Sequence, residues 1–172
     1  MWLDSLLFRV LHYRAGSCAP LDLPALVLAR YGASLEIALM VLATGGPGGR
    51  TTLGRSLGAV ALVYGLSEAA GHLTKRSRPF VTEPRVRRLL EHQPGRSFPS
   101  RHVASAVAMA LVVGRVAPRV GYTMGWLAAG IGLGRARAGL HYPTDLLAGA
   151  LLGAVVGLLS RNRQPREPDL SR

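Results

Sequence analysis

The chain has 172 residues, of which 49% are hydrophobic and 17% are charged, and its net charge at pH 7 is +12. This length predicts a single domain over residues 1–172. The charges gather in short segments between apolar runs, which favours a polytopic membrane protein over a soluble domain. The basic excess does not indicate a nucleic-acid-binding protein, because the arginines fall in the connections between candidate spans.

The first predicted element is a short amphipathic helix. Between Trp2 and His12 the apolar residues recur with a helical period, and polar residues occupy the opposite side. This helix is too short to cross a bilayer. We therefore expect residues 1–20 to form a segment that lies in the membrane interface.

Five apolar runs follow, and each predicts a membrane-spanning helix. They cover residues 23–43, 57–73, 103–117, 120–134 and 146–160, and a polar tail occupies residues 161–172. Several runs are near the lower limit of about 17 residues for a crossing, so loop residues and snorkelling arginines must complete each span. The sequence therefore predicts an all-α polytopic membrane bundle of five to six helices, the N-terminal helix included.

Alternation of the spans divides the connections between two faces. Residues 1–20 share one face with the long connection 75–101 and with the segment that precedes the last span. The opposite face receives the loops 45–56 and 115–119 and the tail. Lysine and arginine are similarly frequent on both faces, so the positive-inside rule does not fix the orientation.

Glycines recur every fourth residue in the last two spans. Small residues at this spacing let helices approach each other closely in lipid. We therefore expect close helix packing at three sets of positions, namely Gly149 with Gly153 and Gly157, Gly121 with Gly125, and Gly130 with Gly134.

The connection over residues 75–101 is the longest polar one and holds eight basic residues. Connections of this length are commonly functional. Glu68 lies just before it, inside the last part of the second span. An ionisable residue in a span is a functional candidate, and the alternative is that Glu68 pairs with a loop arginine near the interface.

Two segments each place a histidine where a polar loop gives way to an apolar run. Residues 97–102 end in His102, and His141 lies four residues before Asp145. Pro99 and Pro143 suit the first turn of a helix, where the missing N–H costs nothing. Both histidines are thus predicted at helix N-termini, where unpaired N–H groups and the positive end of the dipole suit a phosphate.

Other residues at the same level complete a phosphoryl-transfer site. Arg78 and Arg135 are the expected phosphate ligands, because a guanidinium meets phosphate through two parallel N–H bonds. Ser100 can cap the first of the two helices, and its hydroxyl and the amides around Arg101 supply further donors. A histidine nucleophile needs no metal, and the sequence has no metal-ligand spacing, so we expect neither a metal nor a cofactor.

These segments resemble the three motifs of the type 2 phosphatidic acid phosphatase superfamily, K-x6-R-P, P-S-G-H and S-R-x5-H-x3-D. In this chain they read Gly71-x6-Arg78-Pro79, Pro99-Ser100-Arg101-His102 and Gly134-Arg135-x5-His141-x3-Asp145. Two segments are similar to the bacterial undecaprenyl-diphosphate phosphatase branch of this superfamily. They are the run His141-Tyr-Pro-Thr-Asp and the sequence Arg78-Pro-Phe-Val together with Ser-Phe-Pro-Ser-x-His, which ends at His102. The match covers about residues 57–159, and the three spaced motifs are specific only together.

The resemblance implies that His141 is the nucleophile, that Asp145 orients and charges it, and that His102 is the general acid. It implies a metal-independent membrane enzyme that hydrolyses undecaprenyl diphosphate to the monophosphate for carrier-lipid recycling. The partners are then a prenyl diphosphate lipid and the bilayer, and the active site faces the extracytoplasmic side of the bacterial plasma membrane. Four loop arginines exceed what one phosphate needs, which favours a diphosphate: Arg85, Arg87, Arg88 and Arg96.

Three departures from the motifs leave alternatives open. Gly71 replaces the first-motif lysine, Arg101 replaces a glycine and Gly134 replaces a serine. Arg101 either contacts the phosphate or narrows the entrance, and we include it among the phosphate ligands. Lys75 is the candidate replacement cation that we include among the phosphate ligands, with Arg76 and His72 as further possibilities. The alternatives are a phosphatidate-type or phosphatidylglycerophosphate-type phosphatase, and a relative that binds anionic headgroups without turnover. The sequence leaves the oligomeric state open.

Overall fold

The structure is a computed structural model that describes residues 2–13, 19–46, 49–86 and 88–160. Within these residues it forms seven helices and no strand, so the all-α prediction is confirmed. The predicted polar tail 161–172 lies outside the described residues. The helices are α1 (Trp2–Tyr13), α2 (Ala19–Ala43), α3 (Gly49–Thr74), α4 (Pro79–Thr82), α5 (Arg101–Val113), α6 (Pro118–Arg137) and α7 (Pro143–Leu159).

The five long helices lie on the five predicted apolar runs and extend most of them. The single turn α4 was not predicted, because four residues give no periodic signal; Pro79 at its first position fixes φ for a helix. Pro118 and Pro143 begin α6 and α7 for the same reason. Pro99 does not open a helix as expected, since α5 begins two residues later at Arg101.

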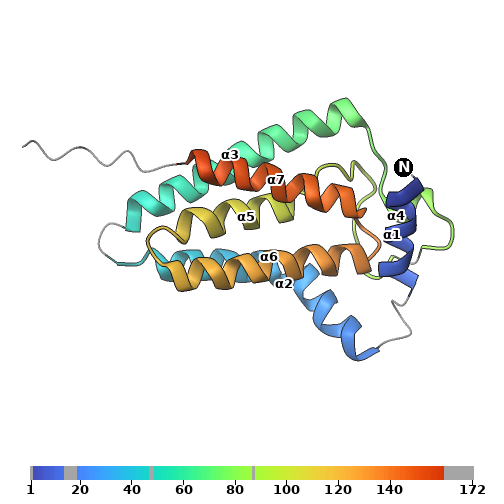
Figure 1. Cartoon of the computed structure of the whole chain (residues 1–172), viewed down its shortest axis with the longest axis horizontal. Helices are drawn as coiled ribbons and strands as arrows, with labels where there is room; N and C mark the ends of the chain where they lie inside the picture. The colour runs from blue at the N-terminus through green and yellow to red at the C-terminus, as the bar shows by residue number, and fades with distance from the viewer. Residues whose placement is uncertain (1, 14–18, 47–48, 87, 161–172) are drawn as a thin grey trace, which may run out of the picture.

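Helix α5 is the centre of the bundle, with α2, α3, α6 and α7 packed around it along the long axis (Figure 1). On one side its small residues pack against α3 and α7, in a cluster that includes Ala104, Ala108 and Val63. On another side a cluster of methionines and valine joins α2, α5 and α6. The core is built mostly from small side chains, so the helix axes lie close together.

Glycine contacts bring α7 directly onto the backbone of α5. A Cβ at Gly153 would lie 2.2 Å from the carbonyl oxygen of Ala104, and one at Gly149 would lie 2.6 Å from that of Ser100. The predicted close approach is therefore present along α7. The prediction of a close helix contact is wrong for Gly125, which faces open space.

The outer faces of α2, α3, α6 and α7 carry large exposed apolar side chains, among them Leu42, Leu73, Trp126 and Leu151. In the described part of the chain, one helix, over Asp22–Ala43, is long and apolar enough to cross a membrane, and α5 and α7 are shorter apolar helices. The five-span topology remains a prediction.

Helix α1 and the connection that contains α4 lie across one end of the bundle (Figure 1). This is the end at which α3 and α6 finish and α5 and α7 begin, as the alternation of the runs predicts. In α1 the side chains of Asp4, Phe8 and His12 are buried against the protein, whereas Leu6 and Val10 are exposed. The interfacial position of this helix also remains a prediction.

Candidate active site

The main chain of the long connection is hydrogen-bonded to the segments that carry the predicted site residues. Ser77 and Arg96 form an antiparallel bridge, and the amide of Ser97 donates to the carbonyl of Arg76 at 2.8 Å. The amide of Ser100 donates to the carbonyl of Asp145 at 2.9 Å, which joins the beginnings of α5 and α7. These bonds hold the loop residues over the helix ends.

His141 is buried, with 3% of its surface exposed, and both ring nitrogens have partners. Its Nδ1 lies 2.9 Å from the carbonyl oxygen of Ser97, which can only accept, so Nδ1 carries the proton. Its Nε2 therefore has a lone pair, and it accepts from Nη1 of Arg78 at 3.1 Å. The contacts thus leave Nε2 as the nitrogen of this imidazole that carries the lone pair, which is the atom that a nucleophilic role would use.

Arg78 and Arg135 are both buried and both bind main-chain carbonyls. Nη1 of Arg78 donates to the carbonyl of Leu140 at 3.0 Å, and Nη1 of Arg135 donates to that of Ala29 at 3.1 Å. Within the described residues, Nε of each guanidinium and the hydroxyl of Ser100 are buried without a hydrogen-bond partner. Buried donors of this kind are normally satisfied, so their presence together points to an anionic ligand.

Asp145 is fully buried and lies beside His141, the residue that the resemblance implies it orients and charges. Its Oδ2 accepts from the amide of Tyr142 at 2.9 Å and lies 3.8 Å from Nδ1 of His141, beyond hydrogen-bond distance. The orienting acceptor is the carbonyl of Ser97 instead. Asp145 acts on the imidazole through its nearby charge and through the turn that begins α7.

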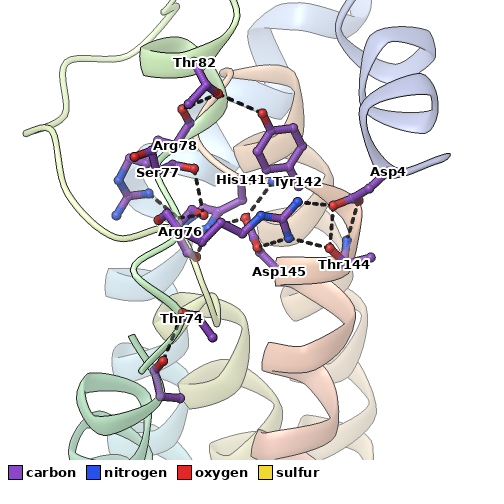
Figure 2. A network of polar contacts seen from close by, with 12 residues as sticks. Asp4, Thr74, Arg76, Ser77, Arg78, Thr82, His141, Tyr142, Thr144 and Asp145 are labelled. Carbon is purple, nitrogen blue, oxygen red and sulfur yellow. Dashed lines mark hydrogen bonds and ion pairs between the residues drawn. The ribbon is translucent and has the colours of Figure 1, made fainter. Parts of the chain in front are cut away.

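Arg76 reaches from the loop to two carboxylates, those of Asp145 and Asp4, as Figure 2 shows. It lies 2.8 Å from Oδ1 of Asp145, and its guanidinium packs over the ring of Tyr142. Asp4 also accepts from the amide of Thr144 in the first turn of α7. Arg76 therefore fastens α1 to the start of α7.

The remaining predicted site residues lie around this centre. His102 is the second residue of α5 and is partly buried. Ser100 is the N-cap residue of α5, as predicted, but its hydroxyl makes no capping bond. Lys75 directly follows α3, has a φ of 48° and is exposed.

A cavity of about 700 Å³ opens beside Arg78, and Lys75 lies on its wall. Arg101 and Arg96 line the same cavity, as do Glu68 and His92. Of the four loop arginines that we counted toward a diphosphate, Arg96 alone lines it within the described residues, and Arg87 lies outside them. Sequence reasoning did not single out His92, because no motif or spacing marks it.

Among the described residues, no group of three or more histidine, cysteine, aspartate or glutamate side chains has an arrangement that could hold a metal ion.

Burial lowers the pKa of His141 to about 4, and the positive charges of Arg135 and Arg78 act in the same direction. The neighbouring carboxylate of Asp145 opposes this shift. Burial also lowers the pKa of Arg78, and the charge of Arg101 adds to that effect. At neutral pH the imidazole of His141 is therefore uncharged in the free protein, as a nucleophile requires.

This state of His141 can be measured directly. With 15N-histidine labelling and without phosphate present, its ring should remain neutral as the pH falls, and should become protonated only near pH 4. The 15N shifts should report a proton on Nδ1 and a lone pair on Nε2, and the signal is assigned by its loss in His141→Ala. A titration near pH 6.5, or a proton on Nε2, would contradict the assignment.

Comparisons with known proteins bear on this arrangement. A family model described as the PAP2 superfamily matches residues 52–168. The chain is 36% identical over 93 residues to the bacitracin transport permease protein BcrC of Bacillus licheniformis, covering 54% of this chain and 46% of that protein. It is 30% identical over 82 residues to the undecaprenyl-diphosphatase BcrC of Bacillus subtilis, covering 48% and 42%.

A likeness to a solved structure extends over nearly the whole chain. The crystal structure of Aquifex aeolicus LpxE superposes with a TM-score of 0.78 at 26% identity, and the match covers 92% of this chain and 94% of that one. By contrast, the chain spans about half the length of the curated relatives it matches.

Proposed function

The chain belongs to the PAP2 superfamily, and from this membership we propose that it is an integral-membrane lipid phosphatase. Its proposed substrate is undecaprenyl diphosphate, which it hydrolyses to undecaprenyl phosphate and inorganic phosphate. The observation that carries the proposal is the set of buried donors beside the histidines. Nε of Arg78, Nε of Arg135 and the hydroxyl of Ser100 have no partner within the described residues, and a phosphoryl group would satisfy all three.

The proposed reaction proceeds through a phosphohistidine. Nε2 of His141 attacks the terminal phosphorus, the bond from phosphorus to the bridging oxygen breaks, and its electron pair leaves with that oxygen. His102 gives a proton to the departing oxygen. A water molecule then attacks the phosphohistidine, the P–N bond breaks, and His102 takes the proton that the water loses. Arg78 and Arg135 stabilise the charge on the equatorial oxygens in both steps.

Two observations support a lipid substrate. The outer faces of the helices carry many exposed leucines together with Trp126, which is 80% exposed, and apolar surface of this extent is typical of contact with lipid. The relative from Bacillus subtilis is named an undecaprenyl-diphosphatase. The proposal therefore includes a multi-pass protein of the bacterial plasma membrane, with its site on the extracytoplasmic side and a role in recycling the cell-wall carrier lipid.

The test is phosphate release by the purified protein from matched detergent micelles that hold one lipid each. Undecaprenyl diphosphate should have a higher kcat/KM than phosphatidate or phosphatidylglycerophosphate, and His141→Ala should release nothing above background. A clear preference for either of the other lipids would assign the site to that substrate class. No release from any lipid by the unchanged protein would show a headgroup-binding protein without turnover.

A further inference from the structure

Arg96 occupies the space beside Gly71, the position at which the first motif has a lysine. A Cβ built on Gly71 would lie 3.3 Å from Cδ and 3.4 Å from Nε of Arg96, and 3.3 Å from the carbonyl oxygen of Phe98. The side chain of Arg96 thus fills the space that a side chain at residue 71 would enter. Arg96 therefore supplies a cation at this place, and Lys75 and Arg76 line the same cavity.

The main chain holds Arg96 in this position. Its backbone pairs with Ser77 in the antiparallel bridge, and the next residue, Ser97, hydrogen-bonds to Arg76. The same Ser97 supplies the carbonyl that orients His141. Arg96 is therefore one residue away from the group that positions the nucleophile, and its placement relative to the reacting centre is determined by backbone hydrogen bonds.

Glu68 pairs with two guanidiniums at the cavity. Its Oε1 lies 2.5 Å from Nη2 of Arg96, and its Oε2 lies 3.5 Å from Nη1 of Arg101. These side chains are between 35% and 47% exposed, and ion pairs this exposed contribute little to stability. A phosphate with two negative charges can displace the carboxylate, which would retain His72, at 3.2 Å, as its partner.

The positions of the cations suggest which phosphate each one binds. The transferred phosphoryl group must reach Nε2 of His141, which is buried behind Arg78. Arg96 and Arg101 lie farther out, partly exposed, on the wall of a cavity that Arg78 also lines. A diphosphate that places its terminal phosphorus at Nε2 would extend its second phosphate toward them.

We propose that Arg96 and Arg101 form a second anion subsite, held by Glu68 in the free protein, that binds the second phosphate of a diphosphate. The inference rests on the proposed function and adds the residues that distinguish a diphosphate from a monophosphate. It assigns Glu68 a role in binding: the carboxylate keeps the two guanidiniums at the cavity and releases them to the substrate.

The test measures binding of two non-hydrolysable probes, farnesyl methylenediphosphonate and farnesyl phosphonate, in detergent. Arg96→Ala should weaken binding of the diphosphonate about tenfold and change binding of the monophosphonate less than twofold. Arg85→Ala removes an exposed loop arginine that does not line the cavity, and it should change neither. An equal loss on both probes, or no loss on either, would overturn the subsite.

A second pair of variants tests the shared space at Gly71. Gly71→Lys alone should weaken binding of the diphosphonate, because the new side chain meets Arg96 and the carbonyl of Phe98. In the Arg96→Ala background the same lysine should restore binding, since the space is then open. Tighter diphosphonate binding by Gly71→Lys alone, or no recovery of binding in the double variant, would contradict the proposal. Failure of the proposed function is distinguishable, because it appears as absence of phosphate release whichever probe binds.

Discussion

Replacement of His141 by alanine is expected to abolish phosphate release, with a loss of at least about 10⁴-fold in kcat. The side chain supplies the only protein atom that bonds to phosphorus in the proposed mechanism, and its Nε2 is already the unprotonated nitrogen. Water positioned at the same place would be a far weaker nucleophile. The measurement is phosphate release under saturating lipid, compared with the unchanged protein at equal concentration.

Because His141 is buried, the variant also needs a check of its fold. Thermal unfolding in detergent and binding of farnesyl methylenediphosphonate should both remain close to those of the unchanged protein, since the arginines stay in place. Loss of turnover with retained binding would place His141 in the chemical step. Substantial turnover in a well-folded variant would remove it from the mechanism.

The second large effect is expected at Arg78. In the free protein its Nη1 donates to the lone pair of His141 Nε2, so the nucleophile is covered by the guanidinium that is to bind the phosphate. An entering phosphate offers that guanidinium stronger acceptors and uncovers the lone pair. Arg78→Ala should therefore lower kcat/KM by about 10²- to 10³-fold, the scale of one lost transition-state donor.

A lysine at position 78 keeps the positive charge but loses the planar guanidinium, so it tests which of the two the site needs. Arg78→Lys should recover little activity, because an ammonium group cannot form two parallel bonds to a phosphate. Arg119→Ala is the matched control, since Arg119 is an exposed arginine at the start of α6, on the other end of the bundle. Near-normal activity of Arg78→Ala would show that Arg135 alone binds the transferred phosphate.

Much of this arrangement could be predicted from the sequence. The apolar runs are long, so they locate the five long helices, and the alternation of these runs predicts that His102, His141, Arg78 and Arg135 lie at one end. The helix start at Pro143 was predicted, because proline fixes φ for the first turn, whereas the same expectation for Pro99 was wrong, since α5 begins at Arg101.

What could not be predicted depends on contacts between segments distant in the chain. The carbonyl that orients His141 belongs to Ser97, and main-chain groups carry no side-chain signal. Arg76 turns toward Asp4 and Asp145, and only the folded position of α1 brings Asp4 within reach. Arg96 enters the space beside Gly71 because a bridge with Ser77 holds the loop there. A sequence with eight cations in one loop does not reveal which of them reaches the cavity.

The close contact between α5 and α7 has a consequence for how such a protein can diverge. Main-chain atoms of Ser100 touch Gly149 and hydrogen-bond to Asp145, so the two segments that carry His102 and His141 are joined through backbone. Their separation does not depend on the rotamers or the sizes of the outward-facing side chains. In the proposed function the outward-facing side chains would meet the lipid tail, and they can change residue by residue while the spacing of the two histidines stays the same. The reaction chemistry and the tail preference would then evolve independently.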